Sequence, residues 1–174
     1  AHALPARELL PLDRWALDRA ARLQAEISEA YDAYQFHSIY HKLHNFCAVD
    51  MGGFYLDIIK DRQYTTRADS AARRSAQTAM YHIVDALARW IAPITSFTAE
   101  EIWENLPGER ADSVFLVEWA DALPTLADDA AMGRDYWARV RAVRDAVNRE
   151  MEARRAAGAI RGSLDAVVTL YADA

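Results

Sequence analysis

Glycine and proline are scarce in this chain, with six and five copies among 174 residues. Because these two residues mark most turns, their scarcity argues against a turn-rich β architecture and favours helices. Hydrophobic residues make up 52% of the chain and charged residues 26%, which is typical of a folded globular protein. The length suits a single domain with a real hydrophobic core.

Cysteine is almost absent, and the single Cys47 excludes an internal disulfide or a cysteine-rich zinc site within the chain. We therefore expect a reducing, cytoplasmic compartment. No apolar run approaches the roughly 18 residues of a membrane-spanning helix, so we expect no membrane partner. The start, at Ala1, lacks the basic and apolar regions of a signal peptide and reads like the middle of a longer protein.

An overall positive charge is also missing, since the formal net charge is −6, which argues mildly against a nucleic-acid partner. Two segments run against this trend. Residues 60–74 hold five cations and two acids, and residues 134–161 hold eight arginines and four acids. Local clusters matter more than the sum, because charges beyond about 8–10 Å are screened at physiological salt. The cations are nearly all arginine, which suits phosphates and bases, although GC-rich coding gives the same bias.

Apolar residues recur at three- and four-residue spacing, which is typical of helices with one buried face. On this pattern we expect helices over roughly residues 13–34, 36–47, 54–64, 71–91, 99–106 and 129–157.

Capping residues set the ends of several of these helices. Asp69 or Ser70 is expected to cap the fourth helix, and Pro93 to end it. Thr98 and Glu101 form a capping-box pattern for the fifth helix, and Gly158 suits the position after the last one. Beyond residue 47, the glycine pair at 52–53 is expected to weaken or bend the continuation of the second helix.

Two segments have extended character instead. "VFLVEW", 114–119, is expected to be a short strand or a packed loop, and "LDAVVTLYA", 164–172, has strand character without a partner strand in the chain. We therefore predict an all-α helical bundle of five or six helices with a short extended tail at the C-terminus. The predicted division is a helical domain at 1–161 and the start of a following segment at 162–174.

No constellation in the chain predicts a catalytic centre. His37, His41 and His44 share a helix face, but the fourth ligand and general base of a zinc site are missing, so we predict no metal site. Asp57 and Asp61 are spaced like paired catalytic carboxylates, yet nearby cations (Lys60, Arg62, Arg67) are expected to neutralise them. The chain also has no phosphate-binding glycine loop and no nucleophile motif.

The stretch "FYLDIIKDRQYT", 54–65, joins an apolar tract to cations, an amide and a ring. An aromatic ring beside cations suits single-stranded RNA, because the ring stacks on a base while the cations hold phosphates. A solvated basic face with internal salt bridges is the alternative, and the residues alone leave both open. The RNA-binding candidates are Lys60, Arg62, Gln63, Tyr64, Arg67, Arg73 and Arg74, together with Arg134, Arg141 and Arg149 of the last helix.

Four stretches resemble bacterial isoleucyl-tRNA synthetases, a class Ia family, in their helical anticodon-binding domain: "LPLDRW" (10–15), "FYLDIIKDRQYT" (54–65), "ARRSAQTAMYHIVDALARWIAPITSFTAEEIWENLPGER" (72–110) and "GSLDAVVTLYA" (162–172). The resemblance covers essentially the whole chain, and the valyl enzymes are the nearest rival.

The resemblance implies a helix bundle that packs against the anticodon stem-loop of tRNA-Ile. It also implies a longer cytoplasmic enzyme, a monomer, whose catalytic and C-terminal domains are further partners. That parent would attach isoleucine to tRNA using ATP and Mg²⁺, with Zn²⁺ in many bacterial members. This chain lacks the family's "HIGH", "KMSKS" and cysteine-rich signatures, so we expect no cofactor and no catalysis from it alone. A bundle that only braces other domains, with little RNA contact, is the alternative function.

Overall fold

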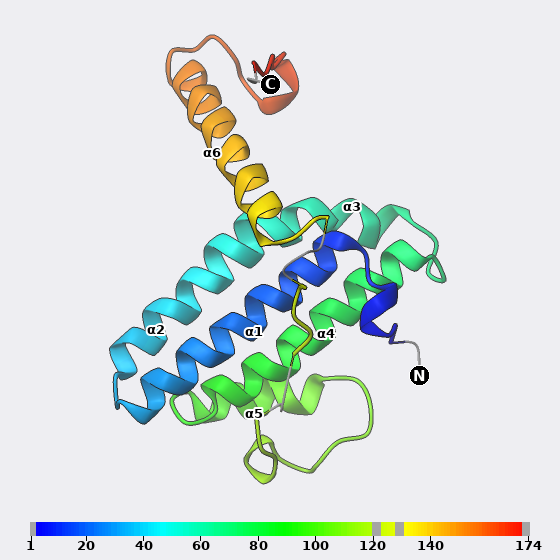
Figure 1. Ribbon diagram of the computed structural model, residues 1–174, viewed down its shortest axis with the longest axis vertical. Coiled ribbons are helices and arrows are strands. Elements are labelled where there is room, and N and C mark those ends of the chain that lie inside the picture. The colour runs from blue at the N-terminus through cyan, green and yellow to red at the C-terminus, as the bar shows by residue number, and fades with distance from the viewer. Residues whose placement is uncertain (1–2, 120–122, 128–130, 172–174) are drawn as a thin grey trace. The chain divides into compact units, whose positions relative to one another are not determined.

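The computed structural model describes residues 3–119, 123–127 and 131–171, and every regular element within them is helical (Figure 1). The α-helices are α1 (Pro11–Asp32), α2 (Phe36–Asn45), α3 (Asp57–Thr65), α4 (Ala71–Ile91), α5 (Ser96–Asn105) and α6 (Arg134–Ala156). The shorter elements are the 3₁₀ turns η1 (Ala6–Glu8), η3 (Val114–Leu116) and η4 (Ser163–Asp165), and the π-helix η2 (Phe46–Leu56). No described helix is both long and apolar enough to cross a membrane.

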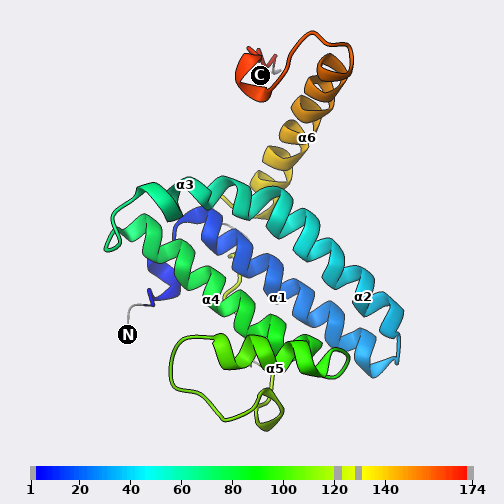
Figure 2. The same ribbon diagram turned by 180° about the vertical axis from the view of Figure 1, so that it is seen from behind.

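The chain divides into two compact units, Ala1–Leu126 and Ala127–Ala174. In the first unit α1 is the central helix, with α2 on one side and α4 on the other (Figures 1 and 2). Pro11 at its first position is compatible with a helix start, since the nitrogen of that residue has no partner within the helix. Its apolar face, including Leu17, Leu23 and Ile27, is fully buried. The helical-bundle prediction is therefore confirmed.

A single helical run leads from α2 through η2 into α3, because the residues at both junctions keep right-handed helical angles. The glycine pair changes the type of helix within this run. A β-carbon at Gly52 would lie 3.2 Å from the Cys47 carbonyl oxygen, and one at Gly53 would lie 3.3 Å from that of Ala48. Glycine thus permits the close approach of residues five apart in a π turn. The expected weakening is realised as a π-helix between two α-helices.

The C-terminal halves of α1 and α4 are joined by two hydrogen bonds that involve side chains. Tyr31 Oη donates a 2.7 Å hydrogen bond to the Trp90 carbonyl, and Trp90 Nε1 donates a 3.0 Å bond to Gln24. Beyond Pro93, α5 folds back and buries Trp103 in a small second core with Ala88, Ala92, Ala99 and Val114. The Tyr31 bond to the Trp90 carbonyl requires a protonated phenol, because the hydroxyl is the donor. Burial raises the pKa of Tyr31 to about 12, which keeps the phenol protonated at neutral pH.

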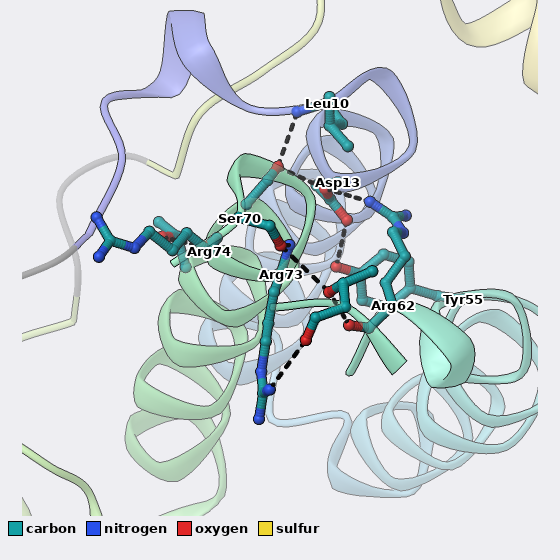
Figure 3. Close-up of polar contacts among 10 residues, drawn as sticks. Leu10, Asp13, Tyr55, Arg62, Ser70, Arg73 and Arg74 are labelled. Carbon is teal, nitrogen blue, oxygen red and sulfur yellow. Dashed lines mark hydrogen bonds and ion pairs between the residues drawn. The ribbon is translucent and has the colours of Figure 1, made fainter. Parts of the chain in front are cut away.

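At the other end of α1, Asp13 joins three helices (Figure 3). Its fully buried carboxylate accepts hydrogen bonds from Tyr55 Oη of η2 at 2.8 Å, from Arg62 Nη1 of α3 at 3.0 Å and from Ser75 Oγ of α4 at 2.5 Å. Ser75 Oγ in turn accepts from the Leu10 amide. Burial, then the charge of Asp13 and the bond to it, raises the pKa of Tyr55, which keeps its phenol a donor.

Two further buried aspartates hold segments against α1. Asp18 accepts a 2.9 Å bond from the Leu126 amide and pairs with Arg22 at 3.2 Å. Asp50 of η2 pairs with Arg19 at 2.8 Å. Buried charges are tolerated only when they are paired and hydrogen-bonded, and each of these carboxylates meets that condition.

The second unit consists of α6 and the segment that follows it. Gly158, with φ of +70°, ends α6 as predicted, and the amides of Gly158 and Ala159 bond back to the Arg155 and Arg154 carbonyls. The tail from Ala159 to Leu170 borders one face of α6. Ala166 has extended backbone angles, but the described tail residues form no strand.

Several local expectations were wrong. The capping box at Thr98 does not form, because α5 already begins at Ser96 after the tight turn that follows Pro93. For "VFLVEW" the second of the two expected alternatives is correct, because it forms the turn η3 and a packed loop and not a strand. Tyr34, expected to be the last residue of the first helix, lies beyond the end of α1 with φ of +56° and is 80% exposed. Ser70 caps α4, as expected, by accepting from the Arg73 amide.

We predict that Asp13→Asn lowers the free energy of unfolding by about 3 kcal/mol, because it leaves Arg62 without its buried counter-charge. Urea titration followed by circular dichroism measures this change. The matched control is Asp69→Asn, which removes an exposed pair with Arg67 and should change the free energy by less than about 0.5 kcal/mol. Equal, small losses of unfolding free energy in both variants would show that Asp13 does not hold these helices together.

We also predict that the stability falls as pH rises from 10 to 12, partly through Tyr31. Its folded pKa of about 12 lies above the ordinary value, so the contribution is complete below pH 10 and is lost toward pH 12. Urea titrations across this range should show a shallower decline in Tyr31→Phe than in the wild type. Tyr34→Phe, at the exposed neighbouring tyrosine, should decline like the wild type, and a Tyr31→Phe curve that overlays it would refute the assignment.

Candidate nucleic-acid interface

The predicted candidates of the first unit gather where α3 ends and α4 begins. We call this set the basic rim, and it consists of Lys60, Arg62, Gln63, Tyr64, Arg67, Arg73 and Arg74. The connection between the two helices is held by its own hydroxyls, since Thr66 Oγ1 bonds the Arg62 carbonyl and Ser70 Oγ bonds Thr66 Oγ1 at 3.2 Å. The rim is therefore displayed by two helix ends joined by a hydrogen-bonded turn.

Two members of the rim point toward the protein. The Arg62 side chain is only 19% exposed, and it pairs with the buried Asp13 at 3.0 Å. The amide nitrogen of Gln63 is buried and has no hydrogen-bond partner among the described residues. Both side chains therefore turn away from the outer surface of the rim, and Arg62 is the one that is bonded within the protein.

Two further cations lie on the surface in ion pairs with near neighbours. Lys60 pairs with Asp57 at 2.9 Å, and Arg67 pairs with Asp69 at 2.9 Å. The hydrogen bond and the charge of Asp57 raise the pKa of Lys60, so its ammonium stays protonated at neutral pH. Exposed pairs of this kind contribute little to stability, so both cations can exchange a carboxylate for a phosphate.

The first turn of α4 carries the least compensated charge of the rim. Arg73 Nη1 donates to the Thr66 carbonyl at 3.3 Å, and neither Arg73 nor Arg74 pairs with a carboxylate in the described part of the chain. The two side chains leave the helix in different directions (Figure 3). The positive end of the α4 dipole adds to their field. Together they make a local anion-attracting surface on an acidic protein.

Tyr64 completes the rim as an open aromatic surface. Its side chain is 86% exposed, and no ring contact is recorded for it among the described residues. A large aromatic ring that the fold leaves uncovered beside cations matches the requirement for stacking an unpaired base.

The remaining arginine candidates belong to the second unit, on α6. Arg134 and Arg149 are exposed, and Arg141 is half-buried. Arg134 and Arg141 take part in interactions of their own. In the last turns of α6, Arg154 pairs with Glu150 and Arg155 pairs with Glu152, so these carboxylates offset the charge of the two arginines.

The histidines of α2 lie on an exposed face of the helix. Tyr40 packs between two of them, with ring centroids 5.3 Å from His41 and 5.9 Å from His44. Across the described residues, no group of three ligating side chains is placed to hold a metal ion. This face shows a ring cluster rather than a ligand set.

The predicted neutralisation of Asp57 and Asp61 is correct only in part. Lys60 does pair with Asp57, but Arg62 pairs with Asp13 and Arg67 with Asp69. The partner that we missed, Asp13, is 49 residues away from Arg62 in sequence. Helical spacing was the available signal, because Asp13 shares the inward face of Leu17 and Ala20 and a buried acid requires a partner.

Comparison with known proteins agrees with this geometry. A family model described as the anticodon-binding domain of tRNA ligase matches residues 13–170. Curated proteins named isoleucine–tRNA ligase are similar over nearly the whole chain. Those of Alcanivorax borkumensis and Nitrosococcus oceani are 63% and 60% identical over 99% of the chain, and that of Saccharophagus degradans is 63% identical over 97%.

The chain spans 18% of the length of each of these relatives, so it corresponds to one part of them. The matched region includes α1 to α6 almost completely and contains the whole basic rim. On this evidence the chain belongs to the family of anticodon-binding domains of tRNA ligases.

Proposed function

We propose that this chain binds the anticodon stem-loop of tRNA-Ile through the basic rim, as one domain of a longer isoleucine–tRNA ligase. One observation carries the proposal. At a single hydrogen-bonded turn, Arg73 and Arg74 lack carboxylate partners among the described residues while the Tyr64 ring is left open. The identity to isoleucine–tRNA ligases supports isoleucine over valine as the parent's amino acid.

The rim residues divide the task by their surroundings. Arg73 and Arg74 contact phosphates, because their charge is not compensated by the fold. Lys60 and Arg67 also contact phosphates, by releasing the surface carboxylates of Asp57 and Asp69 with which they pair. Such contacts supply affinity and orientation but little sequence information. Tyr64 stacks on an unpaired base of the loop.

The inward members and the α6 arginines take secondary parts. Arg62 fixes the end of α3 through Asp13, and both Arg62 and Gln63 reach bases only if RNA binding draws them outward. Arg134, Arg141 and Arg149 add phosphate contacts from the second unit, on the segment where the net charge is again positive.

The activity of the parent lies outside this chain. We propose that the parent attaches isoleucine to tRNA-Ile with ATP and Mg²⁺ in the cytoplasm, acts as a monomer, and holds Zn²⁺ in a region beyond this one. No residue of this chain is proposed to hold ATP or a metal. Its other partners are the catalytic and C-terminal domains of the same polypeptide.

The tail is proposed to complete a sheet in the parent. Ala166 has extended angles, and Leu164, Val167 and Tyr171 are almost fully exposed, as expected for a strand that lacks its neighbour. On this proposal the helical domain comprises residues 1–161, and 162–174 begins the next segment.

A bracing role with little RNA contact is the second candidate. It is favoured by the placement of Arg62 and Gln63 and by the pairing of Lys60 and Arg67. The two functions differ in the salt dependence of binding to an isolated stem-loop.

We predict that binding of this chain to an anticodon stem-loop weakens steeply with salt, and that Arg73→Ala and Arg74→Ala each reduce the log–log slope by about 1. Fluorescence anisotropy at several salt concentrations measures the slope. Lys42→Ala, which removes a cation paired with Glu26, is the control and should leave the slope unchanged. A flat titration of the folded wild-type chain would favour the bracing role.

We predict that Tyr64→Ala costs about 1–3 kcal/mol of stem-loop binding, the usual value of one stacked base. Tyr64→Phe should retain most of the affinity, since the ring and not the hydroxyl stacks. Tyr40→Ala removes an exposed ring from α2 and should bind like the wild type. If Tyr64→Ala also binds like the wild type, the ring does not stack on the RNA.

A further inference from the structure

A groove of about 700 Å³ runs along α4 from the basic rim toward the loop after α5. We call its main apolar lining residues, Met80 and Val84 of α4 with Leu106 and Pro107 of the loop, the floor of the groove. Polar residues on three successive turns of α4 also line the groove, and we call them its edge groups: Arg74, Gln77 and Tyr81. A largely apolar groove of this size with a few convergent polar groups is the usual form of a small-ligand site.

The loop after α5, which lines the groove, is stabilised by contacts of Arg110. Arg110 donates to the Pro107 carbonyl at 2.7 Å and to Tyr81 Oη at 3.4 Å, and its guanidinium stacks 4.9 Å from the Trp103 ring centre. Gly108, with φ of +109°, allows the sharp turn that brings the loop back. The groove is therefore a preformed feature of the fold and not a gap between loose segments.

The edge groups differ in how much hydrogen-bonding capacity the fold has used. Thr78, which also borders the groove, has no proton left to donate, because its hydroxyl donates to the Arg74 carbonyl while accepting from the Leu4 amide. Tyr81 accepts from Arg110, so its own proton is available to donate. The Gln77 side chain is exposed, and the Arg74 guanidinium has no carboxylate partner among the described residues.

This set of groups matches one nucleotide. An apolar floor receives the face of a base, an amide and a phenol can bond to its edge, and a guanidinium at one end holds a phosphate. Arg74 and Tyr81 are seven residues apart, about 10 Å along the helix, which is a suitable span for a base and its phosphate. A purely apolar ligand would leave the charge of Arg74 without a partner.

We propose that this groove holds one unstacked nucleotide of the bound RNA, with its phosphate at Arg74 and its base between Met80 and Leu106. The inference rests on the proposed function, because Arg74 belongs to both the basic rim and the groove. It adds a second base-binding position to Tyr64.

The test fills the groove from an exposed position. Gln77→Trp changes an exposed residue, so no buried side chain is replaced, and it places an indole over the floor of the groove. The variant should weaken stem-loop binding about 10-fold or more, the value of at least one lost base contact. Gln35→Trp is the matched control, because it makes the same change at an exposed glutamine between α1 and α2, and should stay within about twofold of the wild type. Circular dichroism confirms that both variants fold.

A direct readout comes from stem-loops carrying 4-thiouridine at single loop positions, cross-linked to the wild-type chain and mapped by mass spectrometry. The proposal expects one position to cross-link within residues 77–84 or 106–108. If the wild type binds with the predicted salt slope but Gln77→Trp binds equally well and no cross-link maps there, the groove is not a nucleotide site and the rim proposal stands. If the wild type does not bind the stem-loop at all, the proposed function itself fails.

Discussion

The buried carboxylate of Asp13 is the interaction on which this structure depends most. It lies at the start of the central helix and accepts bonds from η2, α3 and α4, at residues that are 42, 49 and 62 positions away from it in sequence. The charge of Asp13 is compensated by Arg62. The hydrophobic segment that precedes Arg62 in sequence packs in the core and so places Arg62 beside Asp13. The cost of burying the acid is offset only when all three partners are in place, so the joint specifies one arrangement of the helix ends.

This joint explains why a hydrophobic segment ends in a cluster of charge. One cation of the cluster, Arg62, is used inside the protein, and its anchoring fixes the end of α3. The neighbouring Tyr64 is thereby presented outward, and the turn locked by Thr66 and Ser70 sets the first turn of α4 beside it. An acidic chain thus displays a small cationic and aromatic surface, held by helices and not by a flexible loop.

Much of the fold could be predicted from the sequence, because helical spacing, Pro93, the Ser70 cap and Gly158 act over a few residues. The same local spacing predicts that the rim residues lie at the end of α3 and the start of α4, and their contact with RNA stays a prediction. What spacing could not reveal was the partner of each charge. Arg62 and Asp13 meet through tertiary packing, and the sequence-local acids looked like sufficient partners. The start of α5 was misplaced because a tight turn after Pro93 overrode a capping pattern.

The central claim is that RNA meets the protein at the turn fixed by the Asp13 joint. Hydrogen–deuterium exchange of this chain with and without an anticodon stem-loop tests it most directly. The account predicts added protection concentrated in residues 64–74, with the turn between α1 and α2 unchanged. Protection that appears at that distant turn, or unchanged exchange across 64–74 at saturating RNA, would contradict it.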